Sequence, residues 1–368
     1  MGGDDGGAAP AHPRSGVSAR TEVSARSGVS ARTRVVVLWS VLGVLLLLAF
    51  AAAFGAAQRA FYSPAGFATS YVDALARHDV RGALSMPGAD PSPASLAAQG
   101  LPRSPSRELL RADALPRLTD VRAVSDDAVA SGEHRVTVRA LADGHPVEAA
   151  FTVKQTGSVL GVLPTWSFSR TPLGIAHVDV EHAGTFEVAG HTLDPRAAGS
   201  PRTDGFGGSA DYLVFAPSRY MLSHRSRYVV AHPVAFIPRA GTVTTVAVDG
   251  EPTAAFTDAV AAQLRRFLDD CARQHVLQPA GCPFGVDIVD RVQGDPSWRM
   301  VHYPLVRLQP GAGGWTMARA GGIAHLSATV QSLFDGTVEQ RESDIPFVVT
   351  LPSVTIRPDG SLDIVVGQ

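Results

Sequence analysis

The sequence predicts an α+β protein in which one transmembrane helix precedes three strand-rich regions. Three observations carry this prediction: an uncharged apolar stretch at 35–57, two amphipathic helical patterns that begin near residues 63 and 252, and many short alternating apolar runs between Gly, Pro and Asp turns. The predicted order is a tail at 1–34, a transmembrane helix at 35–57, a helix-plus-antiparallel-sheet unit at 61–170, a small β-sandwich at 173–250 and an α+β unit at 251–368.

The predicted span reads VVVLWSVLGVLLLLAFAAAFGAA from Val35 to Ala57 and contains no charged residue. As a helix that rises about 1.5 Å per residue, it is about 34 Å long. That length is sufficient to cross a hydrocarbon core of about 30 Å. A helix also satisfies its own backbone hydrogen bonds, as a single segment inside a bilayer must. We therefore expect residues 35–57 to contact the lipid bilayer.

Arginines flank this span unequally. Arg32 and Arg34 immediately precede it, whereas Arg59 is the one basic residue close behind it. Because basic residues are retained on the cytoplasmic side, the asymmetry predicts a cytoplasmic N-terminus and an extracytoplasmic position for residues 58–368. The alternative is a cleaved signal peptide, since small residues at 51–53 and 55–57 are typical of a cleavage site. The apolar stretch is longer than the roughly 7–15 residues of a signal peptide, so we expect an uncleaved single-pass anchor.

The tail at 1–34 contains three related hexamers, SGVSAR at 15–20, TEVSAR at 21–26 and SGVSAR at 27–32. It offers no large apolar side chain to a core, so we expect it to be disordered and cytoplasmic. Its arginines either contact anionic headgroups or a cytosolic partner, or they only supply positive charge within an expanded coding repeat. The second interpretation is favoured.

Composition excludes a nucleic-acid-binding role. The 368 residues carry a formal net charge of −2, whereas nucleic-acid-binding proteins normally show a concentrated basic face. Lys154 is the single lysine, and this preference for arginine indicates high-GC coding bias. About 300 residues follow the span, enough for two or three packed domains.

Cys271 and Cys282 are the only cysteines, and both follow the span. An even pair in an oxidising compartment predicts a disulfide. The alternatives are two reduced cysteines in the core, or a metal site, which would need a second pair of ligands that the sequence lacks.

The region 61–170 begins with a helix signal at Ser63-Pro64, and Phe67, Tyr71, Val72 and Leu75 follow at helical spacing. A second short helix is expected after Asp79. The predicted strands are Leu118–Val124, His134–Ala140, Val147–Val153 and Leu160–Phe168, with a hairpin turn at Asp143-Gly144.

This order resembles the NTF2-like, cystatin-related fold. The resemblance rests on FATSYVDALARHDVRGALSM at 67–86, followed by a loop and antiparallel strands that end in the W-x-F of Trp166 and Phe168. It implies a curved sheet that wraps the first helix into a cone, with Phe67, Tyr71 and Trp166 as a candidate pocket. Some NTF2-like enzymes use a Tyr and an Asp inside the cone. Tyr71 and Asp73 cannot both face one pocket from a helix, so Tyr71 is interpreted as a core aromatic.

Residues 173–250 show no helical period. Short strands are expected at Ile175–Val180, Thr185–Val188, Tyr212–Phe215, Arg219–Leu222, Tyr228–Val230, Val234–Ile237 and Thr242–Val248. The segments TFEVAGH and YLVFAPSRY are similar to small envelope-associated sandwiches of the PEGA type. The glycine-rich insert Pro195–Ser209 is expected to be a mobile loop.

The region 251–368 opens with the most amphipathic helical pattern of the chain. Phe256, Val260, Leu264, Phe267, Leu268 and Cys271 share one face. The strands expected after it are Val301–Leu308, Trp315–Met317, Ala324–Gln331, Thr337–Gln340, Pro346–Leu351, Val354–Ile356 and Leu362–Val366, with turns at Asp335-Gly336 and Asp359-Gly360. This order repeats that of 61–170 and is consistent with a second, diverged NTF2-like unit.

No motif for catalysis, a cofactor or a metal is present in the sequence. His177 and His182 lie near Asp179 and Glu181, but on a strand His177 and Asp179 share a face that His182 does not. We therefore expect no metal site there. The acids of the second helix, Asp258, Asp269 and Asp270, are expected to face solvent. Neither cone is expected to pair a carboxylate with a Tyr or His.

The whole layout resembles single-span envelope proteins of actinobacteria, and it is similar to bitopic components of bacterial secretion and conjugation systems with NTF2-like exterior domains. The anchor, the cysteine pair, the strand-rich regions and the missing catalytic motif predict a non-enzymatic protein of the cell membrane whose extracytoplasmic domains bind other proteins or support assembly, and the resemblance agrees with this prediction. The alternatives are a ligand-binding module that uses the cone interior, or a hydrolase or isomerase.

Overall fold

The computed structural model describes residues 31–159, 163–201 and 205–367. The predicted disorder of the repeats falls almost entirely outside these residues, at 1–30. Residues 31–34 are helical, so the helix begins four residues earlier than the predicted span. The chain divides into two compact units at residues 1–56 and 57–368, which are described separately.

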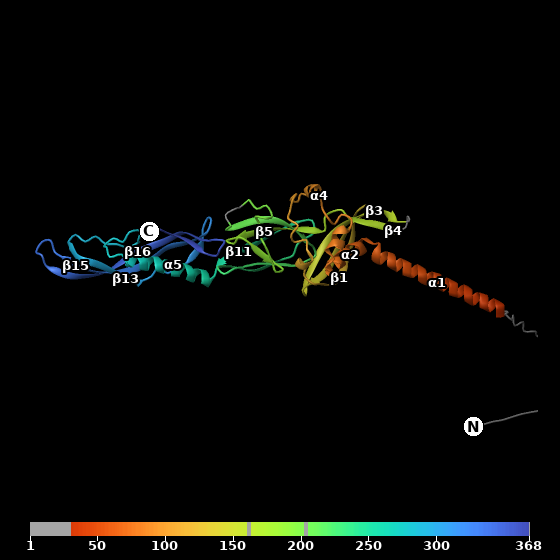
Figure 1. Ribbon diagram of the computed structural model, residues 1–368. Helices are drawn as coiled ribbons and strands as arrows, with labels where there is room; N and C mark the ends of the chain where they lie inside the picture. Colours follow the sequence, from red (N-terminus) through yellow and green to blue (C-terminus); the bar gives the residue numbers. More distant parts are fainter. Residues whose placement is uncertain (1–30, 160–162, 202–204, 368) are drawn as a thin grey trace, which may run out of the picture. The chain divides into compact units, whose positions relative to one another are not determined.

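Helix α1 begins at Ala31 and extends to Phe61, so most of it belongs to the first unit (Figure 1). Its window Val35–Ala52 is long and apolar enough to cross a membrane, and none of that window is buried. The side chain of Ser40 donates a hydrogen bond to Val36 O at 2.8 Å, so its hydroxyl is satisfied within the helix. A signal sequence near an N-terminus has the same length and composition, so these features alone identify a candidate span.

The second unit starts with short helices packed on a sheet. The helices are α2 (Pro64–Ala76), α3 (Val80–Ser85), α4 (Pro93–Ala98) and the 3-10 turn η1 (Ala112–Ala114). The strands are β1 (Leu118–Ala130), β2 (Glu133–Ala142), β3 (His145–Val159) and β4 (Leu163–Phe168), and they form an antiparallel sheet in that order. Part of the strand predicted from Leu160, residues 160–162, lies outside the described residues.

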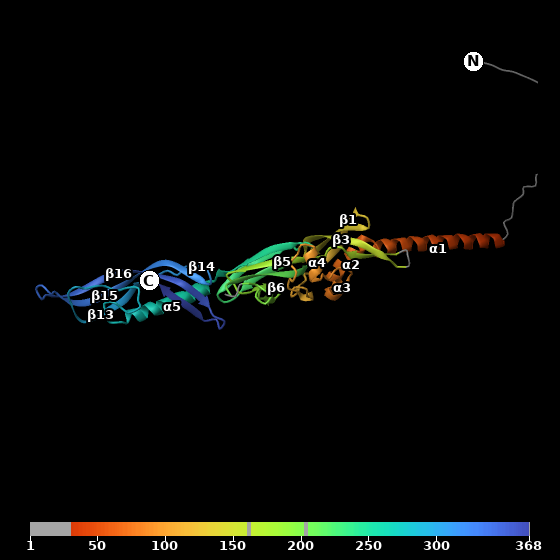
Figure 2. The same cartoon turned by 90° about the horizontal axis from the view of Figure 1, so that it is seen from above.

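Local chemistry explains where these elements begin and turn. Ser63 Oγ accepts a hydrogen bond from Gly66 N at 2.9 Å and caps α2, with Pro64 as its first residue. Asp143 and Gly144 both have positive φ, the conformation that a two-residue hairpin turn requires. Helix α2 lies against β1, β2 and β3 (Figure 2).

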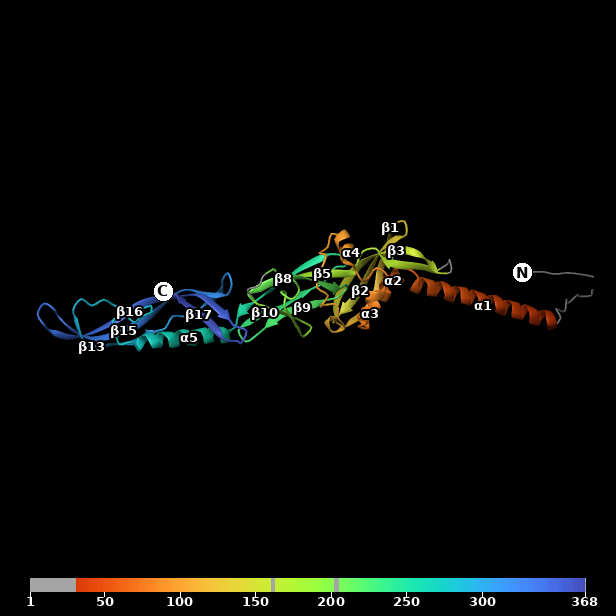
Figure 3. The same ribbon diagram turned by 45° about the horizontal axis from the view of Figure 1, so that its top comes forward.

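Residues 173–252 form two further sheets (Figure 3). One has the order β11-β5-β8, from β5 (Leu173–Glu181), β8 (Gly207–Phe215) and β11 (Val243–Asp249). The other has the order β12-β10-β9-β6-β7, from β6 (Phe186–Val188), β7 (His191–Leu193), β9 (Tyr220–Arg225), β10 (Val229–Phe236) and β12 (Glu251–Pro252). Strand β11 pairs with β5 in parallel. Side chains of both sheets share one hydrophobic cluster.

Two predictions for this region are wrong. Residues 207–209 of the expected mobile loop belong to strand β8, because Gly207 and Gly208 pair with Glu181 and Val180. The two strands predicted at 228–230 and 234–237 are one strand, β10, which a register shift between Ala231 and Val234 interrupts.

The remaining residues form helix α5 (Ala254–Ala272) and a third antiparallel sheet. Its strands are β13 (Arg291–His302), β14 (Leu308–Pro310), β15 (Trp315–Gln331), β16 (Val338–Ile356) and β17 (Leu362–Gly367). They are paired in the order β13-β15-β16-β17, and β14 also pairs with β15. The prediction of a strand at 301–308 is wrong, because residues 303–307 are irregular and strand β13 ends at His302. The predicted strands also imply one interruption within β15 and two within β16, whereas both strands are continuous.

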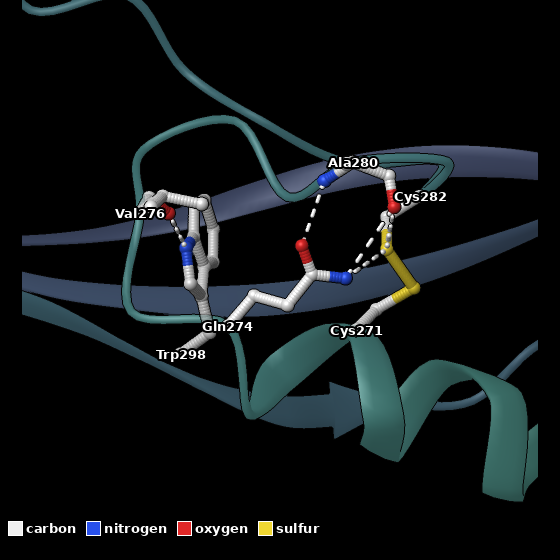
Figure 4. The surroundings of a disulfide bond; sticks show 6 residues. All are labelled: Cys271, Gln274, Val276, Ala280, Cys282 and Trp298. Atoms are coloured by element: carbon white, nitrogen blue, oxygen red, sulfur yellow. Dashed lines mark hydrogen bonds between the residues drawn. A yellow bond between two sulfur atoms is a disulfide. The ribbon is translucent and has the colours of Figure 1, made fainter.

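Helix α5 buries the predicted face: Phe256, Val260, Leu264, Leu268 and Cys271 are buried, and Phe267 packs partly buried beside them. The predicted Cys271–Cys282 disulfide is confirmed, with the two Cα atoms 5.8 Å apart. Figure 4 shows how the intervening loop is held. Gln274 accepts from Ala280 N at 2.8 Å, and Trp298 Nε1 donates to Val276 O at 2.8 Å.

Candidate functional site

A cavity of about 240 Å³ lies between the loops that flank β5 and β8 and the adjoining ends of β15 and β16. Its lining combines two aromatic rings, Phe206 and Trp315, with two imidazoles, His182 and His224. The two aromatic rings meet edge to face with centroids 5.5 Å apart. The cavity therefore offers apolar walls together with a few polar groups, the usual composition of a small-molecule site.

Glycines let the backbone approach this cavity. At Gly314 an added Cβ would lie 2.9 Å from Thr355 Cγ2 and 3.1 Å from Val354 O, so no larger residue fits without displacement. At Gly313 an added Cβ would meet nothing within 4 Å. The cavity thus has one position that tolerates a side chain beside one that does not.

His182 has the most constrained position of the lining residues. It directly follows β5 with φ 58°, a left-handed conformation that histidine adopts more readily than most non-glycine residues. Its ring lies 5.2 Å from Phe206 and 5.9 Å from Trp315 between centroids. Its Nδ1 lies 2.6 Å from Asp249 Oδ1. A carboxylate and two aromatic rings therefore fix the orientation of this imidazole.

A second carboxylate lies beside this pair. The parallel register of β11 and β5 places Asp249 opposite Glu181, the residue before His182. One donor atom from each of the three residues lies within 4.8 Å of the others. Across residues 31–159, 163–201 and 205–367, no other set of three His, Cys, Asp or Glu donors meets this condition.

His224 is buried, with 9% of its surface exposed, and burial lowers its pKa because the charged imidazolium is poorly solvated there. Its Nδ1 lies 3.4 Å from Thr185 Oγ1, a long contact for a hydrogen bond. The neutral ring can donate or accept a hydrogen bond.

The sequence separates His182 from His177 and Asp179, as the structure does, but it does not reveal the partner of His182, Asp249. His177 pairs with Asp211 at 2.8 Å instead of joining His182. Asp249 joins His182 from 67 residues away, through strand pairing that no local pattern encodes. His224, a buried residue of β9, is also a lining residue.

The residues predicted to line a cone pocket are packed together. Tyr71 is fully buried, and its ring contacts Phe151 and Phe168 at centroid distances of 5.6 and 5.3 Å. Phe67 contacts Phe168 at 4.9 Å. Trp166 is 9% exposed and donates to Tyr62 O at 2.7 Å. These contacts agree with the interpretation of Tyr71 as a core aromatic.

One carboxylate of α5 departs from the prediction that its acids face solvent. Asp269 is half-buried, and Tyr303 Oη donates to its Oδ1 at 2.5 Å. This hydrogen bond to the carboxylate raises the pKa of Tyr303. Asp258 and Asp270 are exposed as predicted. The departure arises because Tyr303 directly follows β13, a strand that the sequence analysis placed later in the chain.

Comparison of the chain with protein-family models, with curated proteins and with solved structures finds no match.

Proposed function

We propose that the protein is a non-enzymatic, membrane-anchored envelope protein that docks another envelope protein outside the cell membrane. In this proposal α1 is an uncleaved anchor with a cytoplasmic N-terminus. The arginines that precede it support that orientation. The disulfide supports an oxidising compartment for residues 58–368. Helix α2 on an antiparallel sheet supports an NTF2-like first domain.

The observation that carries the proposal is the tip of the β15–β16 hairpin. Phe334 is 99% exposed and Leu333 68% exposed at this turn. Large apolar side chains at a protruding turn gain little from folding, whereas aromatic anchors dominate the energy of protein interfaces. Such a pair is therefore explained by burial against a partner.

Hydrogen bonds give the turn a defined shape before any partner binds. Ser332 Oγ accepts from Phe334 N at 3.2 Å, and Gly336 N donates to Ser332 O at 3.1 Å. Asp335 Oδ1 accepts from the hydroxyl and the amide of Thr337 at 2.9 and 3.2 Å. Gly336 has a φ of 75°, a left-handed conformation that glycine adopts without steric strain. A preformed turn loses less entropy on binding, which favours a docking element.

The proposal is tested with a photoreactive phenylalanine analogue at position 334 in intact cells. We expect one protein adduct of defined mass, and we expect it to be absent when the analogue replaces Leu305, which is 64% exposed elsewhere. The adduct protein should co-purify with the unmodified chain and be lost from Phe334→Asp. Equal labelling from both positions, adducts with lipid alone, or adducts only with a second copy of this chain would contradict the proposal.

The cavity around His182 and His224 favours a second candidate function, binding of a small ligand. The test replaces Gly313, a lining residue, by Phe, because an added Cβ there meets no atom within 4 Å and the ring adds bulk to the lining without a clash. A ligand that co-purifies with the protein should be detected by native mass spectrometry and be absent from this variant. A ligand that co-purifies with both the wild type and the variant would bind outside this cavity.

A further inference from the structure

The structure assigns a divalent metal site to Glu181, His182 and Asp249, and we propose Zn²⁺ as the ion that it binds. The site is independent of the hairpin tip and of partner docking. It stands on a donor set brought together by two paired strands, on a pair of carboxylates that form no ion pair with any arginine or lysine of the described residues, and on a contrast with the other described histidine–carboxylate pairs.

The donor set is one imidazole nitrogen and two carboxylate oxygens, which all lie within 4.8 Å of one another. Zinc binds such donors at about 2.0–2.2 Å, so neighbouring ligand atoms in a tetrahedral site are about 3–3.5 Å apart. His182 Nδ1 and Asp249 Oδ1 are 2.6 Å apart, joined by the proton of a hydrogen bond. The ion would replace that proton, and small side-chain rotations would complete the three contacts. The remaining position would be open to water or to a ligand.

The paired strands hold the two carboxylates close together. Asp249 and Glu181 are paired across β11 and β5, and Gly250 N donates to Glu181 O at 2.8 Å. In the described residues, neither carboxylate has an arginine or lysine within 4.0 Å. Two close carboxylates repel each other, and a bound divalent cation relieves that repulsion.

The other histidine–carboxylate pairs lack this arrangement. His134, His177 and His191 each contact one carboxylate, from Asp126, Asp211 and Asp113. His325 contacts two, but Asp344 is at Nδ1 and Glu342 is at Nε2, so they lie on different sides of the ring and cannot share one ion with it. Among these groups, only the one around His182 has three donor atoms from three residues within 4.8 Å of one another.

The test uses the full-length protein in detergent, stripped of metal and purified without a histidine tag. Calorimetric titration with Zn²⁺ should show one saturable site, and Co²⁺ should give the absorption bands of a coordinated ion. His182→Ala, Glu181→Gln and Asp249→Asn should each weaken the affinity at least tenfold. The matched control is His177→Ala, which removes a histidine from β5, the strand that directly precedes His182, together with a comparable contact with Asp211. It should bind as tightly as the wild type.

Thermal unfolding separates loss of the site from loss of the fold. Without metal, the His182 and His177 variants should unfold at closely similar temperatures, and added Zn²⁺ should raise the midpoint for the His177 variant and not for the His182 variant. The proposal is wrong if the wild type shows no saturable site at millimolar Zn²⁺. It is also wrong if the His177 variant loses as much affinity as the His182 variant, or if Ca²⁺ binds and Zn²⁺ does not.

Discussion

Tyr71 and Tyr220 are two buried tyrosines with opposite hydrogen-bonding situations. In the described residues, Tyr71 Oη has no hydrogen-bond partner, and burial raises its pKa well above the usual value. Tyr220 Oη accepts from Phe215 N at 3.1 Å, and burial raises its pKa to about 12. A buried hydroxyl without a partner costs about 1–3 kcal/mol.

We therefore expect Tyr71→Phe to leave the free energy of unfolding unchanged or to raise it, by about 1 kcal/mol. Tyr220→Phe should lower it by a similar amount, because the buried Phe215 N–H loses its acceptor. Urea unfolding of both variants measures the difference. A clear loss of stability in Tyr71→Phe would show that its hydroxyl has a partner, and would reopen a functional role for this residue.

His325 provides a pH-dependent contribution to stability. Hydrogen bonds to Asp344 at Nδ1 and to Glu342 at Nε2, both at 2.6 Å, raise its pKa. The folded state therefore favours the imidazolium. The stabilisation is complete below the ordinary histidine pKa of about 6.5 and is lost as the pH rises through the raised value.

His325→Gln should thus lower the urea midpoint most at pH 6, and the difference from the wild type should shrink toward pH 9. His145→Gln, at an exposed hairpin turn, serves as the control and should change the midpoint little at either pH. A deficit in the His325 variant that stays constant across this range would show that packing, and not charge, determines the contribution of His325.

At the scale of single residues, the features predicted correctly from the sequence are those that local chemistry determines. The buried face of α5, the caps at Ser63 and Asp79 and the cysteine pair were all predicted from spacing and residue type. The contacts of His182 with Asp249 and of Tyr303 with Asp269 were missed, because each joins residues that only strand pairing or sheet packing brings together.

At the scale of elements, the loop after α5 is held by the disulfide, by the Gln274 side chain, which also contacts Cys282 Sγ at 3.5 Å, and by the Trp298 indole. In the chain-entropy account, a cross-link that closes a loop of about 12 residues contributes about 3 kcal/mol. The double variant Cys271→Ser, Cys282→Ser should therefore fold but lose up to about 3 kcal/mol of stability. The other two contacts should keep the loop in place.

Urea unfolding with and without reductant measures this contribution. Reductant should lower the stability of the wild type to that of the double variant and should leave the variant unchanged. Gln274→Ala is the control for the loop contacts and should stay sensitive to reductant. A wild type that is insensitive to reductant, although both thiols have become free, would show that the cross-link adds no stability.

The errors in strand assignment have identifiable causes. Strand β13 contains Gly294 and Pro296, residues that normally interrupt strands, and a register shift between Gln293 and Ser297 accommodates them. Strand β15 continues through the small residues Gly321 and Gly322, where an alternating pattern is not visible. Bulges and glycines therefore interrupt the alternating pattern by which long strands are predicted. The ends of these strands were predicted correctly from turn residues such as Asp335-Gly336.

At the scale of the whole molecule, the hydrophobic clusters do not follow the predicted divisions of the chain. The cluster around Tyr71 also contains Leu173, Ile175, Leu213 and Phe215 from β5 and β8. Residues 176, 178 and 180 of β5 belong instead to the cluster that includes Phe256 and Trp315. Sequence periodicity could not show this, because a strand that is buried on both faces lacks alternation. We infer that 57–216 cannot be shortened at residue 170 without exposing part of a core.

Membrane topology is the prediction on which the proposed function depends most. A protease added to intact cells from which any outer barrier has been removed should digest residues 58–368 and leave a fragment that carries the N-terminal tail and α1. A tag at the N-terminus should be protected until the membrane is permeabilised, whereas a tag at the C-terminus should be lost at once. Arg32 and Arg34, which precede the span, are the physical reason for this orientation.

The same experiment separates an anchor from a cleaved signal sequence. An anchored chain keeps its N-terminal tag at the full mass of 38.5 kDa plus the tag, and it remains in the membrane fraction at high salt. Replacing Arg32 and Arg34 by Glu should lower the fraction with a cytoplasmic N-terminus, because the remaining charge asymmetry is weaker. A mature protein that lacks residues 1–57 and is released from the membrane would contradict the anchor, although it would leave the hairpin tip and the metal site open to the tests described for them.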